Sequence, residues 1–252
     1  MLSRRVVVCL DVRGGRVVKG VEFQALRDIG DPVELAQQYE RAGADEIVFL
    51  DISASREARR TLLDVVRRTA EVLFVPLTVG GGIGTVDEIA AALRAGADKV
   101  SMNSAAVANP HLLGEAAARF GAQCVVASID AKRDGDAWRV FTHGGSQATS
   151  LDALEWAERC ACNGAGEILL TSIDRDGSRG GYDIELTRSV AGRVSVPVVA
   201  SGGAGGVDDV VHVLRDGAAD AALVAGIVHD GQCTVADIKA GMERAGLPVR
   251  TA

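Results

Sequence analysis

Two aspartates come directly after strand-like apolar runs, one in each half of the chain. Residues 6–10 lead into Asp11, and residues 124–129 lead into Asp130. A short apolar run bounded by turn signals is typical of a buried strand in a parallel sheet, so each carboxylate is expected at the C-terminal end of a strand. Two facing carboxylates can serve as general acid and general base if their surroundings keep one of them protonated. We therefore expect acid–base chemistry at Asp11 and Asp130.

The elements that must position these aspartates alternate between strand and helix. Asp31-Pro32 predicts a helix start, as N-cap and first helical residue, and residues 138–142 alternate like a hairpin arm. The expected strands cover residues 6–10, 47–50, 74–79, 100–102, 124–129, 168–171, 196–200 and 221–225. The expected helices cover residues 35–42, 61–72, 85–95, 110–120, 151–162, 184–191, 207–215 and 234–245. Eight strand–helix units of this size predict an α/β fold, the (β/α)8 TIM barrel.

The two halves of the chain repeat one another. The run that begins at Gly43 aligns with the run that begins at Gly164, and Gly81-Gly82 aligns with Gly202-Gly203, both at an offset of 121 residues. Asp11 aligns with Asp130 at an offset of 119 residues. An ordered set of motifs at nearly one offset indicates duplication. We expect one domain, residues 1–252, with a two-fold internal repeat of half-barrels, about 1–122 and 123–252.

Glycine-rich loops follow the expected strands at matching places in the two halves. Gly202-Gly203 and Ala225-Gly226 come after the seventh and eighth strands, where barrels bind phosphate through backbone N–H groups and the N-terminus of a short helix. Gly81-Gly82 and Asn103-Ser104 hold the corresponding positions after the third and fourth strands. Such glycines can also serve only to turn the chain, but two loops in register favour anion binding. A substrate with a phosphate group at each end is therefore expected.

The sequence as a whole resembles a known family. The similarity is carried by CLDVRGGRVVKG, VGGGI, ADKVSMNSAAV, and GEILLTSIDRDGSRGGYD followed by VVASGGAGG. These runs are similar to the cyclase subunits of imidazole glycerol phosphate synthase, from histidine biosynthesis. The similarity extends from about Arg5 to Arg250, and the (β/α)8 fold that it implies agrees with the pattern of the elements.

The resemblance implies an enzyme, a lyase and cyclase, that acts on a bisphosphorylated ribulosylformimino-aminoimidazole-carboxamide ribonucleotide. Ammonia attacks the ribulosyl carbonyl, the formimino unit is cleaved, and ring closure gives imidazole glycerol phosphate and aminoimidazole carboxamide ribotide. The catalytic pair of the family matches Asp11 and Asp130. The resemblance assigns Asp130 as the acid and Asp11 as the base, whereas the sequence itself leaves these two roles open.

Further positions match substrate-binding residues of the family. Lys19 would close over the substrate, from a loop too long to be a mere connection; a solvated lysine is the alternative. Asp176 and Gly177 match residues near one phosphate. Three more residues end strands at the same face: Asp51, Thr171 and Ser201. The sequence departs from the family at Gly226, where a hydroxyl residue is expected, and an extra residue precedes it within residues 217–220.

Four charged residues begin expected strands at the opposite face of the barrel: Arg5, Glu46, Lys99 and Glu167. Because charges are rarely buried unless they are paired, one interpretation is an ion-pair plug that only stabilises the barrel. The resemblance implies another, in which these residues gate a channel for ammonia from a glutaminase subunit in a heterodimer. Asp98, beside them, would face that partner.

Composition excludes several classes of function. The net charge of −7 argues against a nucleic-acid partner, and no stretch fits a signal peptide or a membrane span, so no membrane partner is expected. Five scattered cysteines favour a reduced, cytoplasmic protein without disulfides. The histidines are dispersed, at His111, His143, His212 and His229. We therefore expect no metal site, and no cofactor is implied.

Two other functions share some of these features. The related barrel isomerase of the preceding pathway step has the same halves, both aspartates and a bisphosphate substrate. The CLDV and RVVKG runs and the four-charge set argue against it, because an isomerase that does not depend on ammonia has no use for them. A non-catalytic phosphate-binding scaffold is the other alternative, and the intact aspartate pair argues against it.

Overall fold

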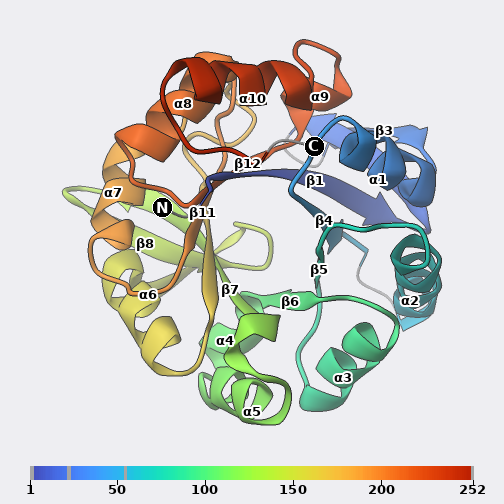
Figure 1. The fold of residues 1–252 in the computed structure, drawn as a ribbon. Coiled ribbons are helices and arrows are strands. Elements are labelled where there is room, and N and C mark those ends of the chain that lie inside the picture. The colour runs from blue at the N-terminus through green and yellow to red at the C-terminus, as the bar shows by residue number, and fades with distance from the viewer. Residues whose placement is uncertain (1–2, 22–23, 54–55, 251–252) are drawn as a thin grey trace.

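Eight parallel strands form a closed barrel in the computed structural model, which describes residues 3–21, 24–53 and 56–250 (Figure 1). In order around the barrel they are β1 (Arg5–Arg13), β4 (Glu46–Asp51), β5 (Leu77–Gly80), β6 (Lys99–Met102), β7 (Val125–Asp134), β10 (Glu167–Ser172), β11 (Val198–Ser201) and β12 (Ala221–Val224). The ring closes because β12 pairs with β1 and β10 pairs with β7, both in parallel. The predicted (β/α)8 barrel is therefore confirmed.

Helices surround the strands (Figure 1). They are α1 (Pro32–Arg41), α2 (Arg56–Ala70), α3 (Val86–Arg94), α5 (His111–Phe120), α6 (Ala153–Cys162), α7 (Ile184–Ala191), α8 (Val207–Arg215) and α10 (Val235–Arg244). Two short helices, α4 (Ser104–Ala108) and α9 (Gly226–His229), follow β6 and β12, and a 3-10 turn, η1 (Ala122–Cys124), precedes β7. α1 begins as predicted, because the Asp31 carboxylate accepts the N–H groups of Val33 and Glu34.

Antiparallel hairpins extend the two strands that carry the aspartates. β2 (Arg16–Val21) and β3 (Gln24–Gly30) fold back along β1, and β8 (Ala137–Thr142) and β9 (Gln147–Asp152) fold back along β7. Gly14 and Gly15 take positive φ angles in the turn between β1 and β2, a conformation that glycine adopts without strain. The arm expected at 138–142 is confirmed. The long loop expected around Lys19 is wrong, because Lys19 lies on β2.

Two apolar layers form the core, because successive residues of a strand point to opposite faces. The inner layer fills the barrel and comprises Val7, Cys9, Val48, Val126, Leu169, Val199, Ala221 and Leu223. The outer layer, which includes Val6, Val8 and Leu10, packs between strands and helices. Alternation therefore puts Arg5 and Asp11 on the inner side of β1, at its two ends. They are six positions apart, which is about 20 Å along a strand.

Several element boundaries differ from the sequence prediction, and two of the differences have a clear physical reason. The third strand was expected over residues 74–79, but β5 begins at Leu77 and Phe74 is 89% exposed. Pro76 has no N–H and offers only its carbonyl, which accepts from Ile47, so regular pairing begins after it. The helix expected over residues 151–162 begins at Ala153, because Asp152 caps it and the preceding residues pair with β8.

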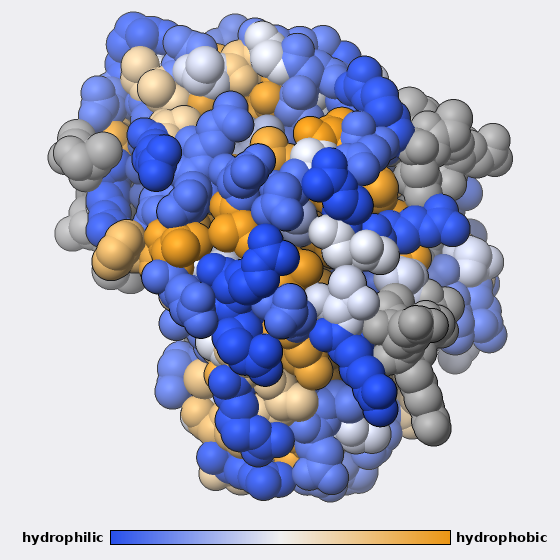
Figure 2. Space-filling model, turned by 90° about the vertical axis from the view of Figure 1, so that its right-hand side faces the viewer, coloured by the Kyte–Doolittle hydropathy of each residue, from blue (hydrophilic) through white to orange (hydrophobic). Residues whose placement is uncertain are grey.

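The side of the barrel over α1 and α2 presents a mainly hydrophilic surface (Figure 2). Within the described ranges, no helix combines the length and the apolar character needed to cross a bilayer.

Candidate active site

Asp11 and Asp130 occupy equivalent, inward-facing positions at the mouth of the barrel. Asp11 pairs in register with Leu50 of β4, and Asp130 pairs with Thr171 of β10. The offset from Leu50 to Thr171 is 171 − 50 = 121 residues, as in the sequence repeat. Each aspartate lies on the same side of its strand as an inner-layer residue, Cys9 on β1 and Val126 on β7. Both carboxylates therefore point toward the barrel interior at the C-terminal ends of the strands.

Burial makes both carboxyl groups harder to ionise. Desolvation, with a smaller contribution from the negative charge of Asp176, raises the pKa of Asp11 to about 6. Desolvation also raises the pKa of Asp130 to about 6, against the opposing effect of a hydrogen bond from Asn103 and with added repulsion from Asp176. Since Asp176 acts on both groups, three carboxylates share one mouth. Such a cluster can hold a proton close to neutral pH.

Asp176 lies on the loop after β10, at the rim of the mouth. Desolvation of its carboxyl group raises its pKa, and the N–H of Gly177 opposes that shift by donating to the carboxylate. The sequence placed Asp176 and Gly177 near one phosphate. The electrostatic link of Asp176 to both inward-facing aspartates is an additional feature, which the sequence did not reveal.

Asn103 and Ser104, expected at a phosphate loop, make contacts inside the protein. The Asn103 amide donates to the Asp130 carboxylate over 2.8 Å and to the Phe141 carbonyl over 3.1 Å. Ser104 accepts the N–H of His143 over 2.9 Å. Asn103 Oδ1 is buried and has no hydrogen-bond partner among the described residues. Asn103 therefore orients Asp130 and keeps one acceptor atom for a further donor.

The two glycine loops make equivalent close contacts with neighbouring strands. A Cβ atom on Gly81 would lie 2.2 Å from the Asp51 carbonyl oxygen, and one on Gly202 would lie 2.7 Å from the Ser172 carbonyl oxygen. Both glycines have positive φ angles. Packing and backbone conformation thus require glycine here whether or not a ligand binds, so the phosphate role of Gly82, Gly203 and their neighbours remains a prediction.

The other strand-end residues lie where the sequence placed them. Thr171 and Ser201 pair in register at the ends of β10 and β11. Asp51, at the end of β4, accepts the N–H of Ser53 through Oδ1 over 2.8 Å, while its buried Oδ2 has no hydrogen-bond partner among the described residues. An unpaired buried carboxylate oxygen is costly, so Asp51 Oδ2 keeps an acceptor atom for a further donor. Alternation along β4 puts Asp51 on the same side as Ile47 and Phe49 of the outer layer.

Lys19 reaches from β2 to the loop after β12. Its ammonium group donates to the Gly226 carbonyl over 3.4 Å and pairs with Asp230. Arg179, from the loop after β10, pairs with the same carboxylate. Sequence reasoning missed Arg179 and Asp230, because neither lies in a repeated motif and only the fold brings them together.

His229 links α9 to β1, and sequence reasoning missed this role as well. One ring nitrogen lies 3.0 Å from the Cys9 carbonyl and the other lies 2.6 Å from the Tyr39 hydroxyl. Because a carbonyl only accepts, Nε2 carries the proton and Nδ1 accepts from Tyr39. Desolvation lowers the pKa of His229 to about 4, so the ring is neutral.

The described residues contain no cluster of three or more His, Cys, Asp or Glu side chains suited to a metal ion.

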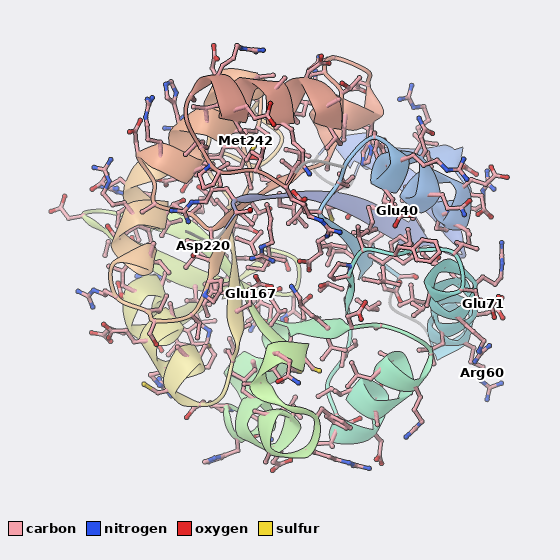
Figure 3. All side chains as sticks on the ribbon, viewed as in Figure 1. Glu40, Arg60, Glu71, Glu167, Asp220 and Met242 are labelled. Atoms are coloured by element: carbon pink, nitrogen blue, oxygen red, sulfur yellow. The ribbon has the colours of Figure 1, made fainter. Side chains whose placement is uncertain are left out.

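The four predicted gate residues meet at the opposite end of the barrel. Glu167 lies near the centre of the barrel in the view of Figure 3. Lys99 bonds both Glu46 and Glu167 over 2.7 Å. Arg5 bonds Glu46 over 2.9 Å and also pairs with Glu167. Two cations and two buried carboxylates thus form a ring of ion pairs below the inner apolar layer. Asp98, next to this ring, is exposed and accepts the N–H of Leu77.

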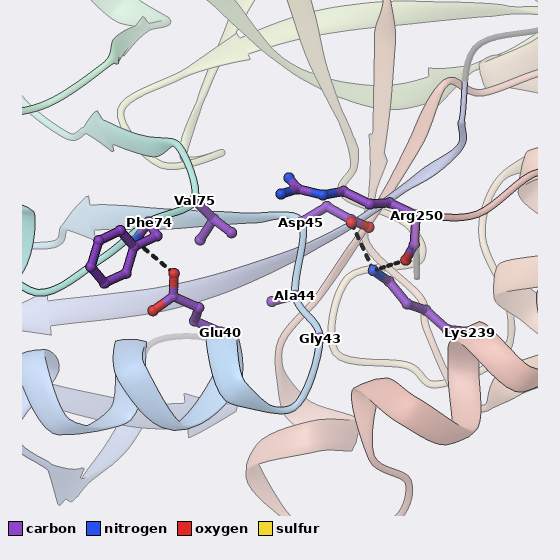
Figure 4. Close-up of a pocket in the computed structure, with 8 residues that line it drawn as sticks. All are labelled: Glu40, Gly43, Ala44, Asp45, Phe74, Val75, Lys239 and Arg250. Carbon is purple, nitrogen blue, oxygen red and sulfur yellow. Dashed lines mark hydrogen bonds and ion pairs between the residues drawn. The ribbon is translucent and has the colours of Figure 1, made fainter. Parts of the chain in front are cut away.

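A small pocket lies on the face where the strands begin, and neither Asp11 nor Asp130 lines it (Figure 4). Its lining residues are Glu40, Gly43, Ala44, Asp45, Phe74, Val75, Lys239 and Arg250. Lys239 bridges the Asp45 carboxylate and the Arg250 carbonyl, and Glu40 accepts the N–H of Phe74. These contacts join chain segments at the bottom of the barrel and contain none of the predicted substrate-binding residues.

Comparison with known proteins agrees with this arrangement. The family model of histidine biosynthesis proteins matches residues 5–234. Imidazole glycerol phosphate synthase subunit HisF of Myxococcus xanthus (strain DK1622) is 67% identical over 251 residues, covering 100% of this chain and 99% of the relative. The same subunit of Hyphomonas neptunium (strain ATCC 15444) is 56% identical over 251 residues, covering 100% of both chains. The resemblance seen in the sequence is thereby confirmed, and this chain belongs to the histidine biosynthesis family, among the HisF subunits of imidazole glycerol phosphate synthase.

Proposed function

We propose that this chain is the cyclase of imidazole glycerol phosphate synthase. With ammonia from a glutaminase partner, it converts the bisphosphorylated ribulosylformimino-aminoimidazole-carboxamide ribonucleotide to imidazole glycerol phosphate and aminoimidazole carboxamide ribotide. The observation that carries the proposal is the pair of inward-facing carboxylates, each with a pKa of about 6, in a chain whose relatives are HisF subunits.

Asp130 serves as the acid and Asp11 as the base, following the family resemblance. Imine formation and ring closure need protons delivered and removed at different ends of the reacting unit, which suits carboxylates on opposite sides of a mouth. Repulsion from Asp176 favours a state in which the cluster retains a proton. The pKa values of Asp11 and Asp130, both about 6, do not separate the two roles.

Each phosphate of the substrate is proposed to bind at one pair of loops. One site combines Gly202 and Gly203 with Ala225 and Gly226, and the other combines Gly81 and Gly82 with Asn103 and Ser104. The other proposed substrate contacts are Lys19, Asp51, Thr171, Asp176, Gly177 and Ser201. The unpaired acceptor atoms of Asp51 and Asn103 support substrate contacts at these two residues, because substrate hydroxyl or amino groups can donate to them.

Ammonia is proposed to enter through the ring of Arg5, Glu46, Lys99 and Glu167 and to pass along the inner apolar layer to Asp11. The apolar layer suits neutral ammonia, because a charged ammonium ion loses far more solvation there. The glutaminase is proposed to dock on the face of this ring. Two residues support that docking face. Asp98 is exposed, and Phe74 is an exposed large hydrophobic residue among those described.

We also propose that residues 1–252 form one domain of two half-barrels, about 1–122 and 123–252, which acts in the cytoplasm. The equivalent registers of Asp11 and Asp130 and the two hairpins support the duplication. All five cysteines are free thiols, which suits a reducing compartment.

Incubation of the purified chain with the bisphosphate and an ammonium salt tests the proposed reaction. Release of aminoimidazole carboxamide ribotide is expected. An isomerised but uncleaved product would instead identify the chain as the isomerase of the preceding step, and no conversion would favour the binding scaffold. Co-purification with the glutaminase subunit, compared between wild type and an Asp98→Lys variant, tests the docking face separately.

A further inference from the structure

One carboxylate at the mouth, Asp230, holds cations from three separate elements. Its Oδ2 contacts both the Lys19 ammonium group of β2 and the Arg179 guanidinium group. Its Oδ1 lies 3.7 Å from the Arg27 guanidinium group of β3. The Asp230 side chain is only 25% exposed. Asp230, directly after α9, therefore ties the β2–β3 hairpin to the loop after β10.

The cations that Asp230 holds lie at a proposed phosphate loop. A Cβ atom on Gly226 would lie 3.7 Å from Lys19 Nζ and 3.9 Å from Arg179 Nη2. Gly226 itself has no side chain that could donate to a phosphate. Lysine and arginine together provide charge-assisted donors that can replace a hydroxyl contact to phosphate.

The backbone of Arg179 is held in place by the neighbouring glycine loop. Arg179 has a φ angle of 55°, which a non-glycine residue rarely adopts. A Cβ atom on Gly205 would lie 2.2 Å from the Arg179 carbonyl oxygen, so the two loops pack directly against each other. Strained backbone that persists through such packing is common at ligand-binding positions. Arg179 is thus built into the site rather than placed loosely on the surface.

We propose that Asp230 competes with a substrate phosphate for Lys19 and Arg179. A single carboxylate oxygen between two cations takes the position in which a phosphate oxygen would make the same contacts. A phosphate dianion beside Gly226 would also repel the Asp230 carboxylate. Phosphate binding therefore displaces Asp230 from Lys19 and Arg179, and Lys19 on the β2–β3 hairpin exchanges the carboxylate for the phosphate. This inference rests on the proposed function, in that the ligand is a phosphate ester.

The test measures binding of inorganic phosphate to the full chain by isothermal titration calorimetry. Because a competing and repelling charge is removed, Asp230→Asn should lower the Kd for phosphate roughly threefold to tenfold. Asp230→Ser, which removes the charge with a different side-chain shape, should change the Kd in the same direction. In an Arg179→Gln background, Asp230→Asn should lower the Kd for phosphate by a smaller factor, because the positive charge of Arg179 is no longer there to bind the phosphate. Asp28→Asn is the matched control, since Asp28 pairs with Arg16 on the same hairpin and should leave the Kd unchanged.

Unchanged or weaker phosphate binding in Asp230→Asn and Asp230→Ser would overturn the inference, and Asp230 would then have a purely structural role. That result would leave the proposed function intact if the wild-type chain binds phosphate. Absence of phosphate binding in the wild-type chain and in every variant would overturn both the inference and the proposed phosphate site. Thermal unfolding of each variant checks that the compared chains are folded.

Discussion

At the scale of single residues, burial sets the chemistry of the mouth. Asp11 and Asp130 each follow an apolar strand, so their carboxyl groups lose solvation and their pKa values rise to about 6. The sequence identified this pair because type and spacing repeat. It could not identify the hydrogen bond from Asn103 to Asp130 or the influence of Asp176 on both aspartates, because these depend on which strand ends become neighbours.

The raised pKa of Asp11 predicts a stability cost at neutral pH. Because the folded-state pKa lies above the unfolded one, the ionised carboxylate destabilises the fold above about pH 6, and the cost disappears below about pH 4. Asp11→Asn should therefore raise the free energy of unfolding by about 1–3 kcal/mol at pH 8 and by much less at pH 4. Denaturant unfolding at both pH values measures this difference. Asp28→Asn, in which an ion pair with Arg16 is lost, should give no such gain.

The same pKa values predict how turnover depends on pH. With two carboxyl groups that each titrate at about 6, the form that holds a single proton is most populated near that pH. Ammonium-driven kcat/KM, corrected for the fraction present as free ammonia, should fall on both sides of a maximum around pH 6. A flat profile from about pH 5 to pH 8 would contradict the acid–base role of the pair.

At the scale of elements, the loops and hairpins that follow the strands determine which side chains meet at the mouth of the barrel. The sequence predicted the barrel strands and most helices from apolar periodicity, and it predicted the arm at 138–142 from alternation. The sequence did not predict β2 and β3, because the run around Lys19 has the length of a long loop. It placed Phe74 in a strand, although Pro76 delays pairing until Leu77. Arg179 and Asp230 come together only through the packing of separate connections.

The anchoring of α9 to β1 by His229 gives a prediction at this scale. His229→Phe removes the partner of the Tyr39 hydroxyl and of the Cys9 carbonyl, so the free energy of unfolding at pH 7.5 should fall by about 2 kcal/mol. Because the folded-state pKa of His229 is lowered to about 4, this stabilisation is complete above about pH 6.5 and is lost as pH falls toward 4. Urea unfolding at several pH values measures the effect. His212→Phe, at an exposed position of α8, is the control and should change stability little.

At the scale of the whole molecule, strand alternation connects the two ends of the barrel along one row of inward-facing residues. On β1 the inner side runs from Arg5 in the charged ring, past Val7 and Cys9, to Asp11 at the mouth. The sequence predicted both ends because each contains charged residues at strand termini. Residue types alone do not distinguish a ring that only stabilises the barrel from a ring that also admits ammonia.

Lys99→Ala separates these two roles. Lys99 bridges Glu46 and Glu167, so its loss opens the ring and leaves Arg5 as its remaining cation. Glutamine-driven turnover of the complex with the glutaminase should fall several-fold more than turnover on free ammonium salt. Equal losses in both assays would refute a gating role. Lys239→Ala, which breaks an ion pair with Asp45 elsewhere on the same face, should leave the ratio of the two rates unchanged.

The most direct test of the catalytic pair is the rate at which aminoimidazole carboxamide ribotide is released from the bisphosphate with saturating ammonium. In Asp11→Asn and in Asp130→Asn, kcat should each fall by about 10²- to 10⁴-fold, because each variant removes one proton-transfer group while the phosphate loops remain. Asp28→Asn should match the wild-type rate. If either mouth variant keeps kcat within a few-fold of wild type, the proposal that Asp11 and Asp130 act together as acid and base is wrong.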